Sequence, residues 1–575
     1  MSLTTAFNIG RSALQASQLG IQVASNNMAN AGTIGYSRQI GRLQSLRGDR
    51  SIPGIMVGGG VIMRSVLRQV DDGIEARLRG ATADQAFAGV RSQISSQIED
   101  ALGELGENDL SSQLSSFFRA WSERANQSRT GASVVQQGEQ LATFIRRLRS
   151  DLSDQSRQVA SQVGAGVDRA NQLLEVIAGL NSEISQAEVA GTIANTLRDQ
   201  RDQSVRELSE IMDVTVVARG QQGIDVLAGS IPVILGSQAR PLSVRREADG
   251  AVSVVSGENE SRLDVRSGTL GALLEGQGDA VDATIDRLDS LASQVIFQVN
   301  RLHSTGARSE GLRSASGTLR LTSAERGLAL NDPSNTALAS LPFAPTNGGF
   351  MVHVRQQGTG ATQAVRINVD LDGLTSAGTP GTADDTSAED IRAQLAAIPG
   401  LAATFTSDGR LDIRAADGFD FSFSDDTSGA LAVLGVNSYF TGTDGASIAV
   451  RSDLSQDASL LMGGRIVDGQ FVENGTALEV AGLQSRSIDA LAGRSILDHW
   501  RDGVQLVGSM AASARSNAEA AAVVREGLEA QRSSVSGVSI DEEALNLLDF
   551  QRQYQAAARI VSVAEQLTQT LLELV

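Results

Sequence analysis

Apolar residues recur with a seven-residue period at both ends of this 575-residue chain, and this pattern constrains its fold most strongly. At the N-terminal end the large residues of the pattern are Leu3, Phe7, Leu14, Ile21 and Met28, and the small residues between them are Gly10, Ser17 and Ala24. A heptad pattern predicts a helix whose narrow apolar stripe packs against another helix, and small residues in the stripe allow a close approach. Asn30, Gly32 and Gly35 are typical of a helix end, so we expect the helix to stop near them.

The C-terminal end carries a similar pattern. Its members are Leu547, Phe550, Tyr554, Ala557, Val561, Ala564, Leu571 and Val575. They predict a final helix, which a break at Gly537 separates from an Ala-rich helix over 503–532. Because heptads report packing and not its partner, the spacing alone favours one intramolecular bundle of both ends over contacts between subunits.

Between the two ends, helical and strand-like patterns alternate. We predict a mainly α protein with β-rich inserted domains, in which the N- and C-terminal helices form a shared coiled-coil-like bundle. The predicted order is an N-terminal heptad helix (1–38), an extended hairpin-like segment (39–70), a helical domain (71–212), a β-rich segment (213–275), a helical segment returning to the core (276–329), a β-rich inserted outer domain (330–455), a segment returning to the helical domain (456–535) and a C-terminal heptad helix (536–575).

The charge and the missing residue types exclude several classes of function. A net charge of -19 opposes binding to phosphate backbones and anionic membranes, so we expect no nucleic-acid partner and no membrane partner. The sequence contains no lysine and no cysteine, which removes P-loop, Schiff-base and thiol chemistry together with thiolate metal sites. We therefore predict a structural protein without a cofactor, and not an enzyme.

The three histidines do not form a recognisable site. His303, His353 and His499 are far apart in the sequence and lack metal-ligand spacing, which favours structural roles. His303 follows Asn300 by one helical turn, so a cap or an interhelix hydrogen bond near Gly306 is the expected role of this pair.

One acidic segment imitates the start of a calcium loop. Asn368, Asp370, Asp372 and Gly373 have the spacing of such a loop, but Thr379 stands where the loop needs a bidentate Glu. We therefore predict a strand that ends in an Asp-Gly turn, and no metal site. Four further acidic residues are expected to be solvated loop charges: Asp384, Asp385, Asp425 and Asp426.

Two terminal segments resemble the signatures of a known family. Residues 25–38, SNNMANAGTIGYSR, resemble the N-terminal signature shared by bacterial flagellar rod, hook and hook-associated proteins. The positions that carry this resemblance are Asn26, Asn27, Asn30, Gly35, Tyr36 and Arg38. Residues 536–559 resemble the matching C-terminal signature. Together the two segments bracket the chain.

Three internal segments narrow the resemblance to subunits at the junction between hook and filament. They are an Asp-x-Arg-Asp helix (197–208), an Asn-x-x-His-x-x-Gly motif (300–306) and the stretch LGVNSYFTG (434–442). In the first segment, Arg198 and Ser204 stand where the family pattern has apolar residues. These departures indicate a different local contact and not a different family.

The resemblance implies a structural subunit that associates head to tail through its terminal helices. We call the apolar residues through which each terminal helix would associate its seam. The C-terminal seam would contain Leu547, Phe550, Tyr554, Val561 and Leu571, and the N-terminal seam would contain the five large residues given above. The other implied partners are the hook protein, the second hook-filament junction protein and a flagellar export chaperone at the C-terminal helix. The implied location is extracellular, in the flagellum, after export by the flagellar secretion apparatus without a cleaved signal peptide.

Two alternatives remain open at this stage. The chain resembles other axial subunits, so a hook-type subunit is one of them. The other is a secreted adhesin or enzyme with helical anchoring ends, in which residues 330–455 would carry the activity. The sequence shows no site in that range that would support it.

Overall fold

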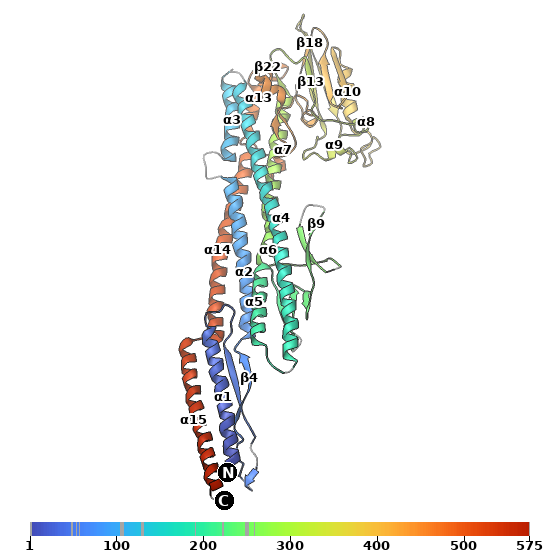
Figure 1. The fold of residues 1–575 in the computed structure, drawn as a ribbon. Helices are drawn as coiled ribbons and strands as arrows, with labels where there is room; N and C mark the ends of the chain where they lie inside the picture. Colours follow the sequence, from blue (N-terminus) through green and yellow to red (C-terminus); the bar gives the residue numbers. More distant parts are fainter. Residues whose placement is uncertain are drawn as a thin grey trace. The chain divides into compact units, whose positions relative to one another are not determined.

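The chain is described from a computed structural model. The residues that it describes are 3–47, 50–52, 55–56, 58–103, 109–127, 131–189, 191–220, 223–247, 252–257 and 259–573. The chain divides into two compact units, each assembled from separate stretches of sequence. Unit 1 contains Met1–Ile94, Gln158–Gly278 and Ala512–Val575, and unit 2 contains Ser95–Arg157 and Asp279–Ala511. Figure 1 shows the elements of both units along the chain.

Three long helices supply residues to both units. They are α2 (Asp72–Leu102), α4 (Ala132–Glu188) and α14 (Ile496–Ser536). Their length follows from a sustained helical spacing of apolar residues with good helix formers between them. The range 71–212, predicted as one helical domain, contains α2 and α4 and is divided between the two units.

The other helices of unit 1 lie at the chain ends and around a β-rich stretch. They are α1 (Leu3–Ala29), α5 (Asn195–Ile211), α6 (Gly268–Glu275) and α15 (Ile540–Glu573), and a π-helical segment (Gly276–Asp282) follows α6. The strands of unit 1 are β1 (Gln39–Ser45), β2 (Arg50–Ile52), β3 (Ile55–Met56), β4 (Val61–Arg68), β5 (Thr215–Ala218), β6 (Ile224–Ala228), β7 (Ile231–Leu235), β8 (Gln238–Ala239), β9 (Leu242–Arg246), β10 (Val252–Ser256) and β11 (Ser261–Arg262).

The strands of unit 1 form small antiparallel sheets. β1 pairs with β4 from Gln39 opposite Arg68 to Ser45 opposite Val61, with a bulge after Arg42. A second sheet has the order β5-β6-β7-β8, and a third has the order β11-β10-β9. The segment predicted as hairpin-like thus contains an antiparallel pair that follows α1 directly.

The two terminal helices of unit 1 pack against each other, and Figure 1 shows α1 and α15 side by side with the two chain ends close together. Glycines on α1 make the close approach possible. A Cβ atom on Gly20 would lie 2.5 Å from Phe550 Cδ1, and one on Gly10 would lie 2.8 Å from Val561 Cγ2. These distances are shorter than carbon atoms tolerate, so small residues are required on α1 where these two large residues of α15 lie.

Unit 2 combines helices of different lengths with antiparallel sheets. Its own helices are α3 (Leu110–Asn126), α7 (Ala283–Ser304), α8 (Ser323–Arg326), α9 (Thr336–Ala339), α10 (Ala388–Ala396), α11 (Ala430–Val433), α12 (Ser452–Gln456) and α13 (Gly475–Gly482). Its strands are β12 (Gly306–Ala307), β13 (Ser314–Ser316), β14 (Gly348–Gln356), β15 (Thr362–Val369), β16 (Leu401–Phe405), β17 (Leu411–Ala415), β18 (Phe419–Ser424), β19 (Phe440–Thr441), β20 (Ala449–Val450), β21 (Gly464–Val467) and β22 (Gln470–Val472).

The β-rich part of unit 2 has its own hydrophobic core. Its two largest sheets have the orders β15-β14-β18 and β13-β17-β16, and α10 packs against β15 and β16. Phe350, Phe423 and Ile391 are fully buried in this core. Ser387 begins α10 in a capping box with Asp390, so both polar ends of the first turn are satisfied.

The predicted fold class is confirmed, because the molecule is mainly helical, its terminal helices pair, and β-rich segments are inserted between helices. The final helix begins at Ile540, close to the predicted break at Gly537. Several elements had no counterpart in the prediction. β14 is the longest of them, and it lies at the centre of its sheet between β15 and β18.

Candidate assembly site

The N-terminal signature folds around a fully buried asparagine, Asn27, near the C-terminal end of α1. Its Nδ2 donates to the carbonyl oxygen of Gln39 at 2.8 Å and to Oε2 of Glu543 at 3.1 Å. Its Oδ1 accepts from the Gln39 backbone N–H at 3.0 Å and from the Tyr36 hydroxyl at 2.8 Å. All four hydrogen-bonding positions of the amide are used, so Asn27 joins α1, β1 and α15 at one point.

The two terminal signatures meet through an ion-pair cluster. Arg38 donates through Nε to Oε1 of Glu543 and through Nη1 to Oε2 of Glu542, both at 2.8 Å. Glu543 is 2% exposed, whereas the side chain of Glu542 is largely exposed. The backbone N–H of Arg38 also donates to the carbonyl of Ser536 at 2.9 Å. A buried carboxylate requires such a partner, so Arg38 fixes the start of α15 to the segment after α1.

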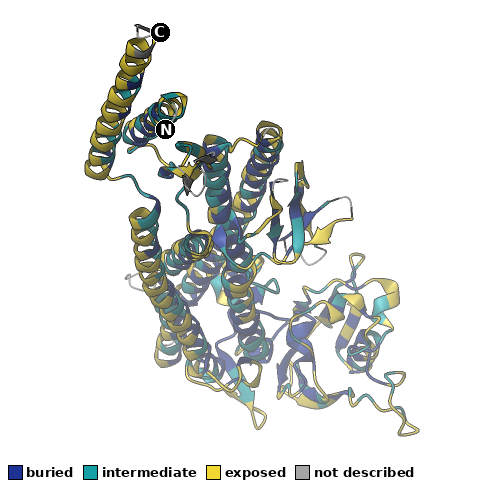
Figure 2. Cartoon of the chain, turned by 90° about the horizontal axis from the view of Figure 1, so that it is seen from below, coloured by how far each residue is buried: buried dark blue, intermediate teal, exposed yellow. Residues whose placement is uncertain are grey.

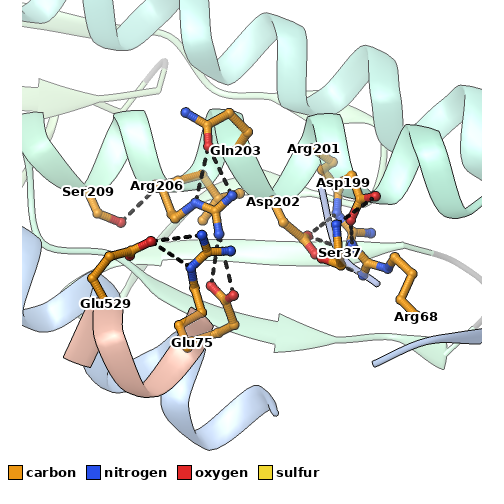
Figure 3. A network of polar contacts seen from close by, with 12 residues as sticks. Ser37, Arg68, Glu75, Asp199, Arg201, Asp202, Gln203, Arg206, Ser209 and Glu529 are labelled. Atoms are coloured by element: carbon orange, nitrogen blue, oxygen red, sulfur yellow. Dashed lines mark hydrogen bonds and ion pairs between the residues drawn. The ribbon is translucent and has the colours of Figure 1, made fainter. Parts of the chain in front are cut away.

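The Asp-x-Arg-Asp helix reaches the same site from a third part of the chain (Figure 3). Asp199 on α5 accepts from the backbone N–H of Ser37 at 3.4 Å and pairs with Arg68 at 2.8 Å. Arg68 also pairs with Asp202 at 2.8 Å. Burial by itself would raise the pKa of Asp202, but the charges of Arg201 and Arg68 outweigh it and lower the pKa. α5 therefore presents carboxylates that hold β4 and the turn after α1.

The remaining signature residues shape the turn after α1. Gly35 has a φ of +81°, which only glycine adopts without strain, and a Cβ there would lie 3.2 Å from Gln203 on α5. Tyr36 accepts through its hydroxyl from Asn26 Nδ2 at 3.1 Å, and burial, with the charges of Asp199 and Glu543, raises the pKa of Tyr36 to about 12. Asn30 donates to the carbonyl oxygen of Asn26 at 2.9 Å.

The two departures from the family pattern on α5 have local explanations. Arg198 forms a bidentate pair with Glu188 at the end of α4, with distances of 2.8 and 2.7 Å. Ser204 is half-buried, and its hydroxyl donates to the carbonyl of Gln200 one turn earlier. Both side chains thus have polar partners at these positions.

The large residues of the N-terminal seam are less buried than its small ones. Gly10, Ser17 and Ala24 are buried against neighbouring elements. Phe7 is 40% exposed, and the other predicted large residues, Leu3, Leu14, Ile21 and Met28, are half-buried. α1 thus packs against α15 through its small residues and leaves large apolar side chains partly open.

The predicted C-terminal seam residues divide between two environments. Phe550 and Val561 pack on the glycines of α1, and Leu547 is half-buried. Tyr554 is 40% exposed, and the side chain of Leu571 lies outside the described residues. Most of this seam is therefore used inside the chain, as the spacing alone favoured.

A second apolar stripe on α15 was not predicted. Ile560, Val563 and Leu567 are 46%, 53% and 52% exposed. Together with Leu3 and Ala6 of α1 they line a groove of about 300 Å³. Figure 2 shows that exposed residues cover most of the surface of α15. The steps of three and four residues within this stripe were the available signal, but the neighbouring seam has the same spacing.

The two other internal motifs meet in unit 2. Asn300 on α7 accepts through Oδ1 from the backbone N–H groups of Tyr439 and Phe440 at 2.9 and 2.8 Å, and donates to the Phe440 carbonyl at 2.9 Å. His303 Nδ1 lies 2.7 Å from the Asn437 carbonyl oxygen. The Asn-x-x-His motif therefore binds the backbone of the LGVNSYFTG segment rather than capping its own helix.

His303 is a structural residue in this arrangement. Its Nε2 accepts from the Met462 backbone N–H at 3.1 Å, so its Nδ1 carries the proton that is donated to Asn437. Burial lowers the pKa of His303 to about 4, and the ring is therefore neutral near pH 7. Because both ring nitrogens have backbone partners, His303 has none left for proton transfer to a substrate.

Two of the four expected solvated charges are not solvated. Asp426 is half-buried and accepts from the backbone N–H groups of Ser428 and Gly429 at 2.9 and 2.8 Å. Asp385 is 5% exposed. Asp384 and Asp425 are exposed as expected. The sequence prediction failed at Asp426 and Asp385 because folded loops brought hydrogen-bond donors to these carboxylates.

Comparison with known proteins gives matches over the whole chain. Residues 95–317 match the model of the flagellar hook-associated protein FlgK helical domain, and residues 529–574 match that of the flagellar basal body rod FlgEFG protein C-terminal segment. Flagellar hook-associated protein 1 of Escherichia coli (strain K12) is 26% identical over 589 residues, with all of both chains covered. That of Bacillus subtilis (strain 168) is 24% identical over 593 residues, covering 99% of this chain and 96% of the relative.

A solved structure is also similar. It is the flagellar hook junction protein FlgK from Burkholderia pseudomallei, with a TM-score of 0.48 and 14% sequence identity, and the match covers 80% of this chain and 100% of that one. Within the described residues, no helix carries an apolar stretch of the length and hydropathy that crossing a bilayer requires.

Paired terminal helices, joined where an N-terminal and a C-terminal signature meet, define an axial protein of the bacterial flagellum, and its partners are other flagellar axial proteins. Within that class, the helical-domain match and the full-length relatives indicate which axial protein the chain resembles. The chain is similar over its whole length to flagellar hook-associated protein 1, and it is a structural component of the flagellum.

Proposed function

We propose that this chain is a subunit of the junction between hook and filament, which assembles head to tail with further copies of itself through its terminal helices. α1 and α15 form one preassembled pair, and the open apolar side chains of that pair contact the corresponding helices of neighbouring subunits. Head-to-tail contacts of this kind generate a ring or a helical zone.

The observation that carries this proposal is the exposed stripe of Ile560, Val563 and Leu567, which lines a groove together with residues of α1. An apolar helix face without an internal partner is typical of a surface that another helix covers. α1 covers Phe550 and Val561 and borders Ile560, because a Cβ on Gly10 would lie 3.3 Å from Ile560 Cγ2. Val563 and Leu567 are the more exposed members of the stripe and are available to a second molecule. The exposed ring of Phe7 on α1 would extend the same contact.

The further partners that we propose are the hook protein, the second hook-filament junction protein and a flagellar export chaperone. The chaperone would bind the C-terminal helix, where an amphipathic face is open in the monomer. We also propose an extracellular location after export through the flagellar secretion apparatus without a cleaved signal peptide. The role is structural and not enzymatic.

Two titratable residues that line a cavity of unit 2 have structural partners. A cavity of about 1230 Å³ in this unit is lined in part by His303 and Asp420. His303 is held by two backbone groups, and Asp420 pairs with Arg355 at 2.9 Å and accepts from Gln357 at 3.2 Å. Both His303 and Asp420 are thus held by contacts within the fold.

The test is electron microscopy of cells that lack this gene and carry either an empty plasmid or a plasmid with a wild-type copy of the gene. We expect the empty plasmid to give hooks without filaments and filament subunits in the medium, and the wild-type copy to restore filaments. Normal filaments without the gene would contradict the junction role and favour an adhesin or enzyme.

A point variant tests the proposed surface directly. Val563→Asp places a charge in the exposed stripe, so we expect it not to restore filaments. Gln569→Asp adds the same charge on an exposed face that helical geometry places away from both the stripe and α1, and we expect it to restore filaments. Equal rescue by the two variants would contradict assembly through the stripe.

A further inference from the structure

Three aspartates of unit 2 converge in the segment between β15 and α10. Asp370 and Asp372 follow the end of β15, and Asp385 precedes the N-cap of α10. Oxygen atoms from the three carboxylates all lie within 4.8 Å of one another. None of the three carboxylates forms an ion pair with an arginine of the described chain. Three like charges therefore share one small volume without a countercharge.

Asp385 differs from its two exposed neighbours, because it is 5% exposed. Its Oδ2 accepts from Asn331 Nδ2 at 2.6 Å and from the Gly373 backbone N–H at 3.2 Å. Its Oδ1 is buried and has no hydrogen-bond partner. A buried carboxylate oxygen without a donor is strongly unfavourable, and proteins generally resolve this with a cation or an ordered water.

A second orphaned oxygen belongs to the residue that holds Asp385. Oδ1 of Asn331 is also buried without a partner. Since the Asn331 amide donates to Asp385, this oxygen belongs to the same group of contacts. Two buried acceptors without donors thus accompany two exposed carboxylates. Carboxylate and amide oxygens are the ligands that hard divalent cations prefer.

We propose that Asp370, Asp372 and Asp385 bind a calcium ion. Ca²⁺ binds oxygen ligands at about 2.3 to 2.6 Å, so two ligands on opposite sides of the ion are separated by about 4.6 to 5.2 Å. The carboxylate oxygens lie within 4.8 Å of one another, so a single ion can reach all three. Ca²⁺ accepts flexible sets of about six to eight oxygen ligands, whereas Mg²⁺ requires a strict octahedron at about 2.0 to 2.1 Å.

The site departs from the calcium loop that the sequence imitates. In such a loop the last ligand is a bidentate Glu, and in this sequence Thr379 stands at the position of that Glu. The third carboxylate comes instead from Asp385, which the antiparallel course of the loop returns to the end of β15. Bound calcium would therefore link β15, α10 and the turn that contains Asn331.

The experiment is isothermal titration of the full-length chain with CaCl₂ after removal of metal with EDTA, together with thermal unfolding at the same calcium concentrations. We expect saturable one-site binding and a melting temperature that rises with calcium. The double variant Asp370→Asn with Asp372→Asn alters only exposed ligands, so its fold is retained, and its calcium affinity should fall at least about tenfold. Asp385→Asn should abolish binding.

The matched control is Asp384→Asn, which removes the same charge from the next residue. Asp384 is exposed and accepts from the backbone N–H of Ser376 at 2.5 Å, outside the three-carboxylate group. This variant should bind calcium as the wild-type chain does. The proposal is overturned if the wild-type chain neither binds nor is stabilised by millimolar calcium, or if the double variant and the Asp384 variant lose affinity equally.

Discussion

The core around Trp121 in unit 2 and the pair of helices α1 and α15 in unit 1 both join distant parts of the chain, but with opposite chemistry. Trp121 is fully buried, and its ring centroid lies 5.6 Å from that of Tyr439 and 6.3 Å from that of His303. In the helix pair, by contrast, the buried residues are small, and large apolar residues such as Val563 remain exposed. The core closes within one molecule, whereas the helix pair leaves large apolar side chains exposed.

Each of the two regions contains a buried asparagine whose side chain binds backbone groups of a remote segment. Asn27 holds β1 and the start of α15, and Asn300 holds the loop at Tyr439. Each amide satisfies donors and acceptors that would otherwise be buried unpaired. The polar contacts therefore fix the position of remote segments in both regions, and the regions differ in whether their large apolar side chains are buried or exposed.

The largest expected effect is truncation of the aromatic core. We expect Trp121→Ala to lower the free energy of unfolding of unit 2 by about 3 to 5 kcal/mol, because it leaves a large cavity beside Phe117 and Tyr439. Denaturant unfolding followed by circular dichroism would measure it. Trp121→Phe keeps part of the ring volume and should cost clearly less. An equal loss in both variants would contradict cavity formation as the cause.

The next effect depends on pH. Burial lowers the pKa of His303 from 6.5 to about 4, so between these values the unfolded chain binds more protons than the folded one. The contribution of His303 to the free energy of unfolding is therefore fully present above pH 6.5, the pKa in the unfolded chain, and it is lost as the pH falls toward about 4. At about 1.4 kcal/mol per unit, the loss approaches about 3 kcal/mol.

Comparison with His303→Gln isolates this contribution. The variant has no titrating group at this position, so its free energy of unfolding should depend less steeply on pH between 6.5 and 4. His353 and His499 are present in both proteins and cancel in the difference. Parallel pH profiles for the two proteins would contradict a buried neutral His303.

A smaller effect on stability is expected at Gly20, where α1 packs closely against Phe550 of α15. Gly20→Ala brings a Cβ to within 2.5 Å of the Phe550 ring, so we expect overpacking to cost about 1 to 3 kcal/mol and to loosen α1 from α15. Hydrogen exchange of the α1 amides would report the loosening. Gly32→Ala is the matched control, because nothing lies within 4 Å of its added Cβ. Equal exchange in both variants would show that close contact at Gly20 is unnecessary.

The elements with strong local signals were predictable from the sequence. α1 ends at Ala29, next to Asn30 and Gly32, and α15 begins at Ile540, shortly after Gly537. Heptad spacing and helix-ending residues act over a few positions, and the sequence displays them directly.

The candidate site was predictable only as a set of motifs. Arg38 and Glu543 are separated by 505 positions, and no local pattern indicates that they pair. Likewise, periodicity could not separate the seam of Phe550 and Val561 from the stripe of Ile560 and Val563, because both have helical spacing. Which face α1 covers depends on glycines in a different helix, and therefore on tertiary packing.

The smallest expected effect on the monomer is at the stripe itself. Val563 is 53% exposed, so Val563→Asp should change the free energy of unfolding by no more than about 0.5 kcal/mol. Sedimentation should then show a folded monomer, while assembly in cells is lost. If the variant instead destabilised the monomer as much as Gly20→Ala, Val563 would belong to the internal packing of α1 and α15. The helix pair would then be as complete within one molecule as the core around Trp121.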